Sequence, residues 1–181
     1  MNGNVTMKMF GLVGWSGSGK TTLMKKLLPV FIERGLRVST LKHTHHNVDI
    51  DQPGKDSYEH RRAGAYEVML SSSARWSLTH ELRDESEPDV AALAQFMAPV
   101  DLLLIEGFKN QKHDKIEIYR AELKQELLCV HDTSIVAVVT DDILPDVSIP
   151  VFSLNDVDGI ADFIMMHGHL AVNQQSGKAH G

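Results

Sequence analysis

The eight residues Gly14–Thr21 have the types and the spacing of a phosphate-binding loop. They read Gly-Trp-Ser-Gly-Ser-Gly-Lys-Thr and fit the pattern G-x-x-x-x-G-K-[ST]. Glycines let the backbone fold around an anion, so that successive N–H groups point at phosphate oxygens. Lys20 is placed to reach the β- and γ-phosphates, and the hydroxyl of Thr21 is placed to ligate Mg²⁺. The pattern predicts a nucleotide site, and the alternative is an ordinary loop rich in glycine and serine.

The loop and the residue after it supply the candidate nucleotide contacts. They are Gly14, Trp15, Ser16, Gly17, Ser18, Gly19, Lys20, Thr21 and Thr22. The flanking sequence predicts the strand–loop–helix setting that such a loop requires. Residues 7–13 read as a short buried strand, while Leu23, Leu27 and Phe31 recur at the spacing of one helix face.

An acidic residue at the end of a second apolar run is the candidate partner for Mg²⁺. A phosphate loop needs such a carboxylate, usually on a neighbouring strand. Residues 102–105 are all apolar and are followed by Glu106, while Asp101 precedes them. The two carboxylates would lie about 17 Å apart along a strand. We therefore predict Thr21 and Glu106 as the metal-side residues, and Asp101 as the less suitable alternative.

Three histidines and two aspartates gather in residues 43–51, after the predicted strand over residues 37–43. Imidazole suits Zn²⁺ or Ni²⁺, so His43, His45 and His46 could bind a metal. They could instead face the phosphates or the substrate, or form a polar loop that bonds to its own backbone. If the chain were a kinase of a small metabolite, Asp49 or Asp51 could act as the base near the γ-phosphate. We take Lys20 and Asp51 as the candidate catalytic residues.

A further acidic pair follows the apolar run at residues 135–139. A carboxylate just beyond a strand can accept hydrogen bonds from N1 and the exocyclic amine of guanine. Adenine lacks that donor pair on the same edge. Asp141, preferred over Asp142, is therefore the candidate residue for selecting GTP, although Thr140-Asp141-Asp142 is also a common turn sequence.

The composition limits the class of protein. The chain has 181 residues, a net charge of −6 and a single cysteine, Cys129. Without a basic surplus, nonspecific nucleic-acid binding is not expected. One cysteine excludes an intrachain disulfide and a cysteine-based zinc site. No basic and apolar leader and no run of 18 apolar residues is present, so we expect a cytoplasmic chain without a membrane span.

Strand-like and helix-like runs alternate along the rest of the chain. Residues 57–65, 87–98 and 156–167 read as helices, and residues 116–119, 135–140 and 151–153 as strands. Residues 67–71 and 76–82 read as a hairpin. We predict an α/β fold: a mostly parallel P-loop NTPase sheet flanked by helices, with an added antiparallel β-hairpin. Residues 1–7 are expected to be a flexible leader, 8–168 a single P-loop GTP-binding domain and 169–181 a disordered tail.

Together these motifs resemble the MobB family, the molybdopterin-guanine dinucleotide biosynthesis adapter proteins. The resemblance runs in order over roughly residues 8–167. The matching pieces are 14–22, the Leu-Lys-His-Thr-His-His run at 41–46, the Asp-Gln-Pro-Gly-Lys-Asp-Ser run at 51–57, the Leu-Ile-Glu-Gly-Phe-Lys run at 104–109 and residues 155–163.

The resemblance implies a homodimeric P-loop protein that binds GTP and Mg²⁺ and is a weak GTPase. It also implies a role in molybdenum cofactor biosynthesis beside the GMP-transferring guanylyltransferase and molybdopterin-handling proteins. Three alternatives stay open. They are a GTPase metallochaperone for nickel or another metal, a kinase of a small metabolite, and a scaffold that binds GTP without hydrolysing it. The single cysteine makes the metallochaperone less expected, because such proteins tend to bind their metal with several thiolates.

Overall fold

The computed structural model describes residues 7–44, 49–144 and 147–170. Their contacts form two compact units: residues 1–43 with 94–181, and residues 44–93. The first unit holds the main sheet and the phosphate loop, and the second holds the hairpin. The single domain expected over residues 8–168 stays a prediction, as do the expected leader and tail, which lie largely outside the described residues.

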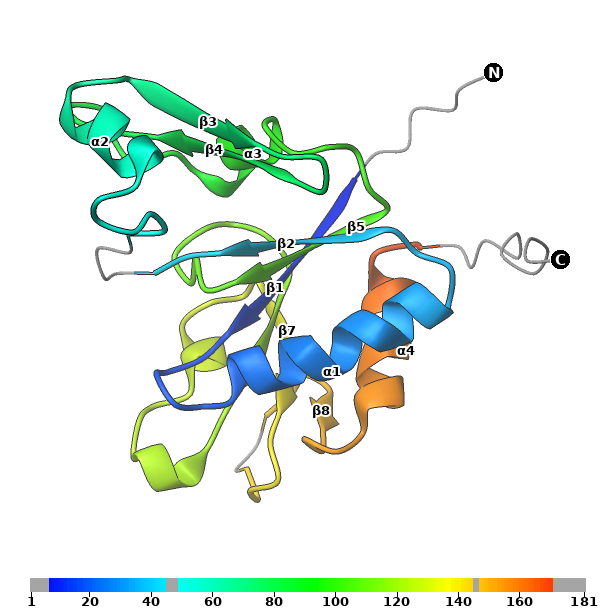
Figure 1. Cartoon of the computed structure of the whole chain (residues 1–181). Coiled ribbons are helices and arrows are strands. Elements are labelled where there is room, and N and C mark those ends of the chain that lie inside the picture. Colours follow the sequence, from blue (N-terminus) through cyan, green and yellow to red (C-terminus); the bar gives the residue numbers. More distant parts are fainter. Residues whose placement is uncertain (1–6, 45–48, 145–146, 171–181) are drawn as a thin grey trace, which may run out of the picture. The chain divides into compact units, whose positions relative to one another are not determined.

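A six-stranded sheet forms the centre of the first unit (Figure 1). All of its strand pairs are parallel, and the spatial order is β2-β5-β1-β6-β7-β8. The strands are β1 (Lys8–Val13), β2 (Val38–Lys42), β5 (Leu102–Glu106), β6 (Lys115–Ile118), β7 (Ile135–Val139) and β8 (Val151–Phe152). The predicted parallel α/β sheet is therefore confirmed.

Two amphipathic helices, α1 (Lys20–Glu33) and α4 (Val157–His167), pack against each other beside the sheet (Figure 1). The core that they share with the sheet is built from side chains at alternate strand positions. Its members include Phe10, Leu12, Leu104, Leu27, Phe31, Ile160 and Ile164. The side chain of Asp156 caps α4 by accepting a 3.0 Å hydrogen bond from the Gly159 N–H. Two short 3₁₀ helices, η1 (Ala121–Leu123) and η2 (Leu128–Val130), follow β6.

The second unit contains α2 (Asp56–Arg62) and an antiparallel hairpin of β3 (Glu67–Ser71) and β4 (Trp76–His80). The predicted hairpin is confirmed. The helix predicted over residues 87–98 is much shorter in the structure, where α3 spans only Val90–Ala94. Proline at 88 and at 99 brackets this segment, and the Asp89 carboxylate accepts a 2.8 Å hydrogen bond from the Ala92 N–H at the helix start.

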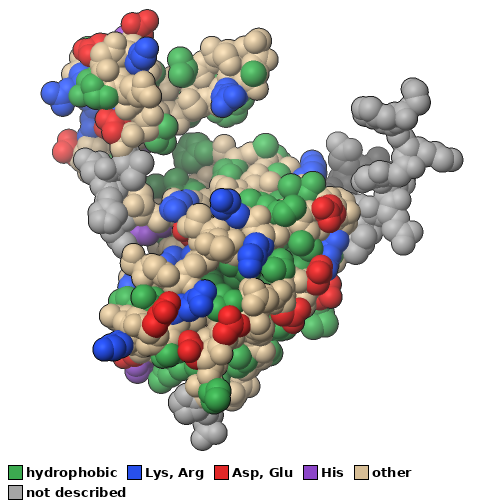
Figure 2. All heavy atoms as spheres, turned by 60° about the horizontal axis from the view of Figure 1, so that its bottom comes forward, with side chains coloured by type: hydrophobic (Ala, Val, Ile, Leu, Met, Phe, Trp, Pro, Cys, Tyr) green, Lys and Arg blue, Asp and Glu red, His purple; other side chains and the backbone are tan. Residues whose placement is uncertain are grey.

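Because all six strands run the same way, their carboxyl ends meet at one edge of the sheet, where α/β proteins bind ligands. The residues directly after these strands, among them Gly14, His43, Gly107 and Thr140, therefore lie at this edge. On the face shown in Figure 2, basic and acidic side chains are interspersed over the larger unit. Among the helices in the described part of the chain, none has the length and apolar character needed to cross a membrane.

Candidate functional site

The predicted phosphate loop connects β1 to α1 at the carboxyl edge of the sheet. Gly14 has φ 141°, and a Cβ there would lie 2.3 Å from the carbonyl oxygen of Ile118. Gly19 has φ 101° and is the residue that precedes the first turn of α1. At these two positions only glycine fits the backbone without strain. The loop glycines are thus required by the path of the chain.

The loop has the features of an anion site. The Ser18 hydroxyl is buried and has no hydrogen-bond partner within the described residues. A buried donor left unsatisfied costs free energy, which a ligand acceptor would offset. No side chain caps the first turn of α1, and that turn contains no acidic residue. Its backbone N–H groups and the positive end of the helix dipole therefore suit a phosphate.

Lys20 folds back over the loop that precedes it. Its Nζ donates to the carbonyl oxygens of Gly14, at 2.9 Å, and Trp15, at 2.8 Å. Burial lowers the pKa of Lys20, and the charges of Lys42 and Lys109 lower it further, whereas Glu106 raises it. The site therefore concentrates positive charge around one carboxylate, an arrangement that favours an anionic ligand.

Thr21 and Glu106 are in direct contact. The Thr21 hydroxyl donates to Glu106 Oε1 at 2.6 Å, and Glu106 is only 8% exposed. Asp101, at the other end of β5, instead accepts a 2.7 Å hydrogen bond from the Arg37 N–H. The predicted neighbourhood of Thr21 and Glu106 is therefore present. A hydroxyl beside a buried carboxylate is an oxygen donor pair of the kind that Mg²⁺ uses, so these residues fit the ion.

Gly107, directly after Glu106, has φ 92°, and a Cβ there would lie 3.1 Å from Cβ of His43. The His43 N–H also donates to the Glu106 carbonyl oxygen at 2.9 Å. These contacts hold the end of β2 beside the end of β5. They place the backbone of His43, one of the three predicted histidines, next to the backbone of Glu106, the residue predicted to bind the metal.

Trp15 is held by contacts that sequence reasoning missed. Its indole N–H donates to the carbonyl oxygen of Glu126 at 3.0 Å, and the Lys109 ammonium lies 4.5 Å from the centre of its ring. Lys109 belongs to the segment after β5, and Glu126 to the segment after β6. Two segments distant in sequence thus fix the second residue of the phosphate loop.

The segment that contains Glu126 is anchored by Glu117, which is fully buried in β6. Its carboxylate accepts hydrogen bonds from the N–H groups of Leu128, at 2.8 Å, and Cys129, at 2.9 Å. Burial raises the pKa of Glu117. Burial and Glu117 raise the pKa of the Cys129 thiol to about 11, so this cysteine is not poised as a thiolate ligand. The signal in the sequence was a carboxylate between two isoleucines in a predicted strand.

Asp141 borders a hollow of about 120 Å³ beside the phosphate loop. Its lining includes Gly19, Thr22 and Asn155. Asp141 Oδ1 accepts hydrogen bonds from the Ser153 hydroxyl, at 2.8 Å, and the Leu154 N–H, at 3.0 Å. These bonds lower the pKa of Asp141 and keep it charged. Within the described residues, no hydrogen bond reaches its Oδ2.

Asp142 has a different task from its neighbour. Its Oδ2 accepts a 2.8 Å hydrogen bond from the Ala121 N–H, and its own N–H donates to the Thr140 hydroxyl at 3.0 Å. Asp142 therefore closes a turn and holds η1. Between the two acidic residues, Asp141 is the one that borders the hollow.

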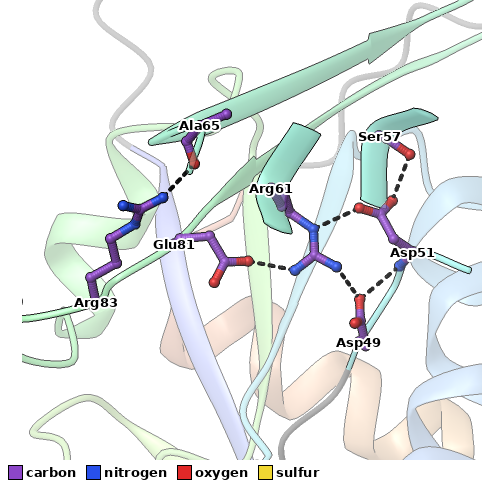
Figure 3. A network of polar contacts seen from close by, with 7 residues as sticks. All are labelled: Asp49, Asp51, Ser57, Arg61, Ala65, Glu81 and Arg83. Atoms are coloured by element: carbon purple, nitrogen blue, oxygen red, sulfur yellow. Dashed lines mark hydrogen bonds and ion pairs between the residues drawn. The ribbon is translucent and has the colours of Figure 1, made fainter. Parts of the chain in front are cut away.

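Asp51 lies in the second unit, inside a network around Arg61 (Figure 3). Its carboxylate accepts from Arg61 Nε at 2.7 Å and from the Ser57 hydroxyl at 3.2 Å. Arg61 also pairs with Asp49 and Glu81, each at 2.5 Å. The catalytic role of Asp51 stays a prediction. His45 and His46 lie outside the described residues, within which no cluster of metal-ligating side chains occurs.

Comparisons with known proteins agree on one family. The model of the MobB family, "Molybdopterin guanine dinucleotide synthesis protein B", matches residues 9–141. The chain is 43% identical to the "Molybdopterin-guanine dinucleotide biosynthesis adapter protein" of Escherichia coli (strain K12), over 91% of this chain and 95% of that protein. It is 38% identical to the protein of the same description from Haemophilus influenzae, over 89% of both chains.

Solved structures agree with this assignment. The fold is similar to a crystal structure of "molybdopterin-guanine biosynthesis protein B (mobB)", with a TM-score of 0.69 and 28% identity over 88% of this chain and 99% of that one. It is also similar to the crystal structure of Bacillus subtilis MobB, with a TM-score of 0.67 and 26% identity over 88% and 97% of the two chains. From its motifs, its fold and these similarities, the chain belongs to the MobB family.

Proposed function

We propose that this chain binds GTP with Mg²⁺ at residues 14–22 and assists the biosynthesis of molybdopterin guanine dinucleotide. The observation that carries the nucleotide site is the 2.6 Å contact between Thr21 and Glu106, at the helix that begins with Lys20. It supports the proposal because one hydroxyl and one carboxylate would hold the ion that accompanies the phosphates. The pathway role rests on the relatives, two of which bear the description of adapter protein in that biosynthesis.

Each residue of the site has a distinct proposed task. The backbone N–H groups of the loop and of the first turn of α1 bind the phosphates. Lys20 exchanges the carbonyl oxygens of its own loop for the β- and γ-phosphate oxygens. Thr21 and Glu106 hold Mg²⁺, which supplies charge neutralisation on the phosphate oxygens. All of these tasks serve the binding of the nucleotide and its metal ion.

We propose that hydrolysis is weak and that the protein acts chiefly as an accessory. Efficient phosphoryl transfer needs a residue that orients the attacking water. Asp51 is the candidate for that task, and its carboxylate is engaged by Arg61 and Ser57. A carboxylate that already accepts hydrogen bonds from an arginine and a serine is not free to orient a water molecule, so slow turnover is expected.

Guanine selectivity is assigned to Asp141 and to the hollow that it borders. The hollow adjoins Gly19 and Thr22 of the loop, so a base bound there would be continuous with phosphates bound at the loop. Asp141 Oδ2 supplies an acceptor for the guanine edge. The proposed partners are the guanylyltransferase that attaches GMP, molybdopterin-handling proteins and a second copy of this chain, all in the cytoplasm.

Binding and pathway measurements test the two parts of the proposal separately. The purified chain is titrated with GTP in the presence and absence of Mg²⁺, and phosphate release is followed over hours. It is then added to a guanylyltransferase reaction that contains molybdopterin and GTP. Mg²⁺-dependent GTP binding and faster dinucleotide formation support the proposal. Failure to bind GTP at millimolar concentration overturns the nucleotide site, and an unchanged guanylyltransferase rate overturns the pathway role.

A further inference from the structure

Lys42 lies at the metal-side residues without belonging to the phosphate loop. It is the last residue of β2, which pairs with β5 so that Lys42 is in register with Glu106. Its Nζ is 3.1 Å from Glu106 Oε1 and 3.5 Å from the Thr21 hydroxyl oxygen. The Lys42 ammonium is therefore shared by the two oxygen donors that the proposed function assigns to Mg²⁺.

The two members of the ion pair differ in their freedom to move. The Glu106 side chain is 10% exposed, whereas that of Lys42 is 59% exposed. A buried carboxylate needs a countercharge, because an unpaired buried charge is strongly destabilising. The lysine has a flexible four-carbon stem, most of it in solvent, and can leave the carboxylate without disturbing the core. Glu106 thus stays fixed while its countercharge can be exchanged.

An ammonium and Mg²⁺ cannot share these oxygens closely, because the two cations repel each other at short range. Mg²⁺ approaches its oxygen ligands to about 2.0–2.1 Å. The ion would therefore displace Lys42 from Glu106. Lys42 would move into the same solvent-exposed edge of the sheet where Lys20 and the phosphates are proposed to lie.

We propose that Lys42 is an exchangeable countercharge: it neutralises Glu106 when Mg²⁺ is not bound, and turns to the γ-phosphate when Mg²⁺ and GTP bind. This inference rests on the proposed function. Two consequences follow. Lys42 competes with Mg²⁺ and raises the concentration of the ion needed for GTP binding. Once displaced, the Lys42 ammonium contacts the γ-phosphate. GTP has this group and GDP lacks it, so Lys42 favours GTP over GDP.

The test is a Mg²⁺ titration of GTP binding and of GDP binding at constant ionic strength, in the parent and in Lys42→Met. Methionine keeps a similar length and removes the charge. In Lys42→Met, GTP binding is expected to reach half-saturation at a roughly threefold to tenfold lower Mg²⁺ concentration than in the parent. This factor corresponds to the loss of a partly exposed ion pair worth about 1 kcal/mol. At saturating Mg²⁺, the preference for GTP over GDP is expected to fall by a similar factor.

Two further variants sharpen the test. Lys42→Arg keeps the charge and can hold the carboxylate with two parallel hydrogen bonds, so half-saturation should move to higher Mg²⁺. This opposite shift is informative even if the methionine variant folds poorly. Lys8→Met is the matched control, because it removes the same charge at the start of β1, at the opposite edge of the sheet. It should leave both measurements unchanged.

The outcomes separate this inference from the proposed function. If the parent fails to bind GTP with Mg²⁺, both are overturned. If the parent binds and Lys42→Met keeps the parental Mg²⁺ requirement and GTP-to-GDP ratio, only the role of Lys42 is overturned. A higher Mg²⁺ requirement in Lys42→Met would also overturn it, since Lys42 would then help to build the metal site.

Discussion

The Thr21 hydroxyl donates a 2.6 Å hydrogen bond to the carboxylate of Glu106, although the two residues are 85 positions apart. The contact joins the first turn of α1 to the end of β5. Asp101, at the start of β5, instead binds the Arg37 N–H. In the parallel sheet, the carboxyl ends of the strands meet at one edge. Glu106 therefore lies beside the phosphate loop, whereas Asp101, only five residues earlier, lies at the opposite edge.

Glu106→Gln is expected to raise the Mg²⁺ concentration needed for GTP binding by roughly tenfold or more, because one charged oxygen ligand is replaced by a neutral amide. Asp101→Asn is the matched control. It removes the same charge at the other end of the strand and should alter stability rather than the Mg²⁺ requirement. The measurement is nucleotide affinity over a Mg²⁺ series. A larger effect from Asp101→Asn would make that residue the metal-side acid.

Asp141→Asn is expected to erode a preference for GTP over ATP. Adenine would leave the Asp141 carboxylate without the two donors that guanine offers, so the parent is expected to bind GTP roughly tenfold or more tightly than ATP. Competition of GTP and ATP for the parent and the variant measures the ratio. Phosphate-driven binding should persist in the variant. Equal binding of the two nucleotides by the parent, or a ratio that the substitution leaves unchanged, would contradict the assignment.

Much of the fold could be predicted because strong local patterns dominate it. The apolar run before Glu106 is a fully buried central strand, and the loop after β1 carries a motif whose glycines have one structural use. The hairpin was visible as two strand-like runs around a polar turn. Local pattern failed at α3, where Asp89 caps a helix that spans only Val90–Ala94.

Other parts of the site could not be predicted, because they depend on long-range contacts. The bond from Trp15 to Glu126 involves a backbone carbonyl 111 residues away, which no side-chain pattern marks. The approach of Lys42 to Thr21 and Glu106 depends on the register of β2 against β5. Residue types predicted which chemistry was present, whereas strand order and register determined which groups meet.

The chain is expected to form a homodimer through the β3–β4 hairpin. Met69 pairs with Leu78, and Ser71 with Trp76, so Met69, Trp76 and Leu78 share one face of the hairpin. Their exposed fractions are 61%, 65% and 40%, and a two-stranded sheet with such a face is marginal alone. Light scattering at micromolar concentration should show a dimer. A monomeric parent would contradict this.

Met69→Glu combined with Leu78→Glu places charge on that face and should weaken the dimer by at least roughly a hundredfold, as expected for buried interface anchors. Met166→Glu is the control, because Met166 is equally apolar and 72% exposed on α4 in the other unit. If this control dissociates the dimer and the hairpin variant does not, the interface lies elsewhere.

His113 should make stability depend on pH. Burial lowers its pKa from 6.5 to about 4, with the charge of Lys115 acting in the same direction and Asp114 and Asp132 opposing it. Both ring nitrogens are buried and lack a hydrogen-bond partner within the described residues. Because the folded state takes up a proton less readily than the unfolded state, the stabilising contribution is complete above pH 6.5 and is lost as the pH falls toward 4.

The expected loss of unfolding free energy from His113 between pH 7 and pH 5 is about 1 kcal/mol, because the residue is only partly buried and solvent screens part of the effect. Urea denaturation of the parent and of His113→Gln at both pH values measures it. Glutamine cannot titrate, so lowering the pH from 7 to 5 should destabilise the parent more than the variant. A difference that is the same at both pH values would show that His113 does not titrate in this range.

The most direct test of the nucleotide site is calorimetric titration of GTP with Mg²⁺ into the parent and into Lys20→Ala. The parent should bind, and the variant should lose roughly a hundredfold or more in affinity, because the cation proposed for the β- and γ-phosphates is gone. Its unfolding free energy should change by only about 1–2 kcal/mol, since Lys20 makes two partly buried hydrogen bonds to backbone carbonyls. A folded Lys20→Ala variant that binds GTP with Mg²⁺ as tightly as the parent would contradict the account.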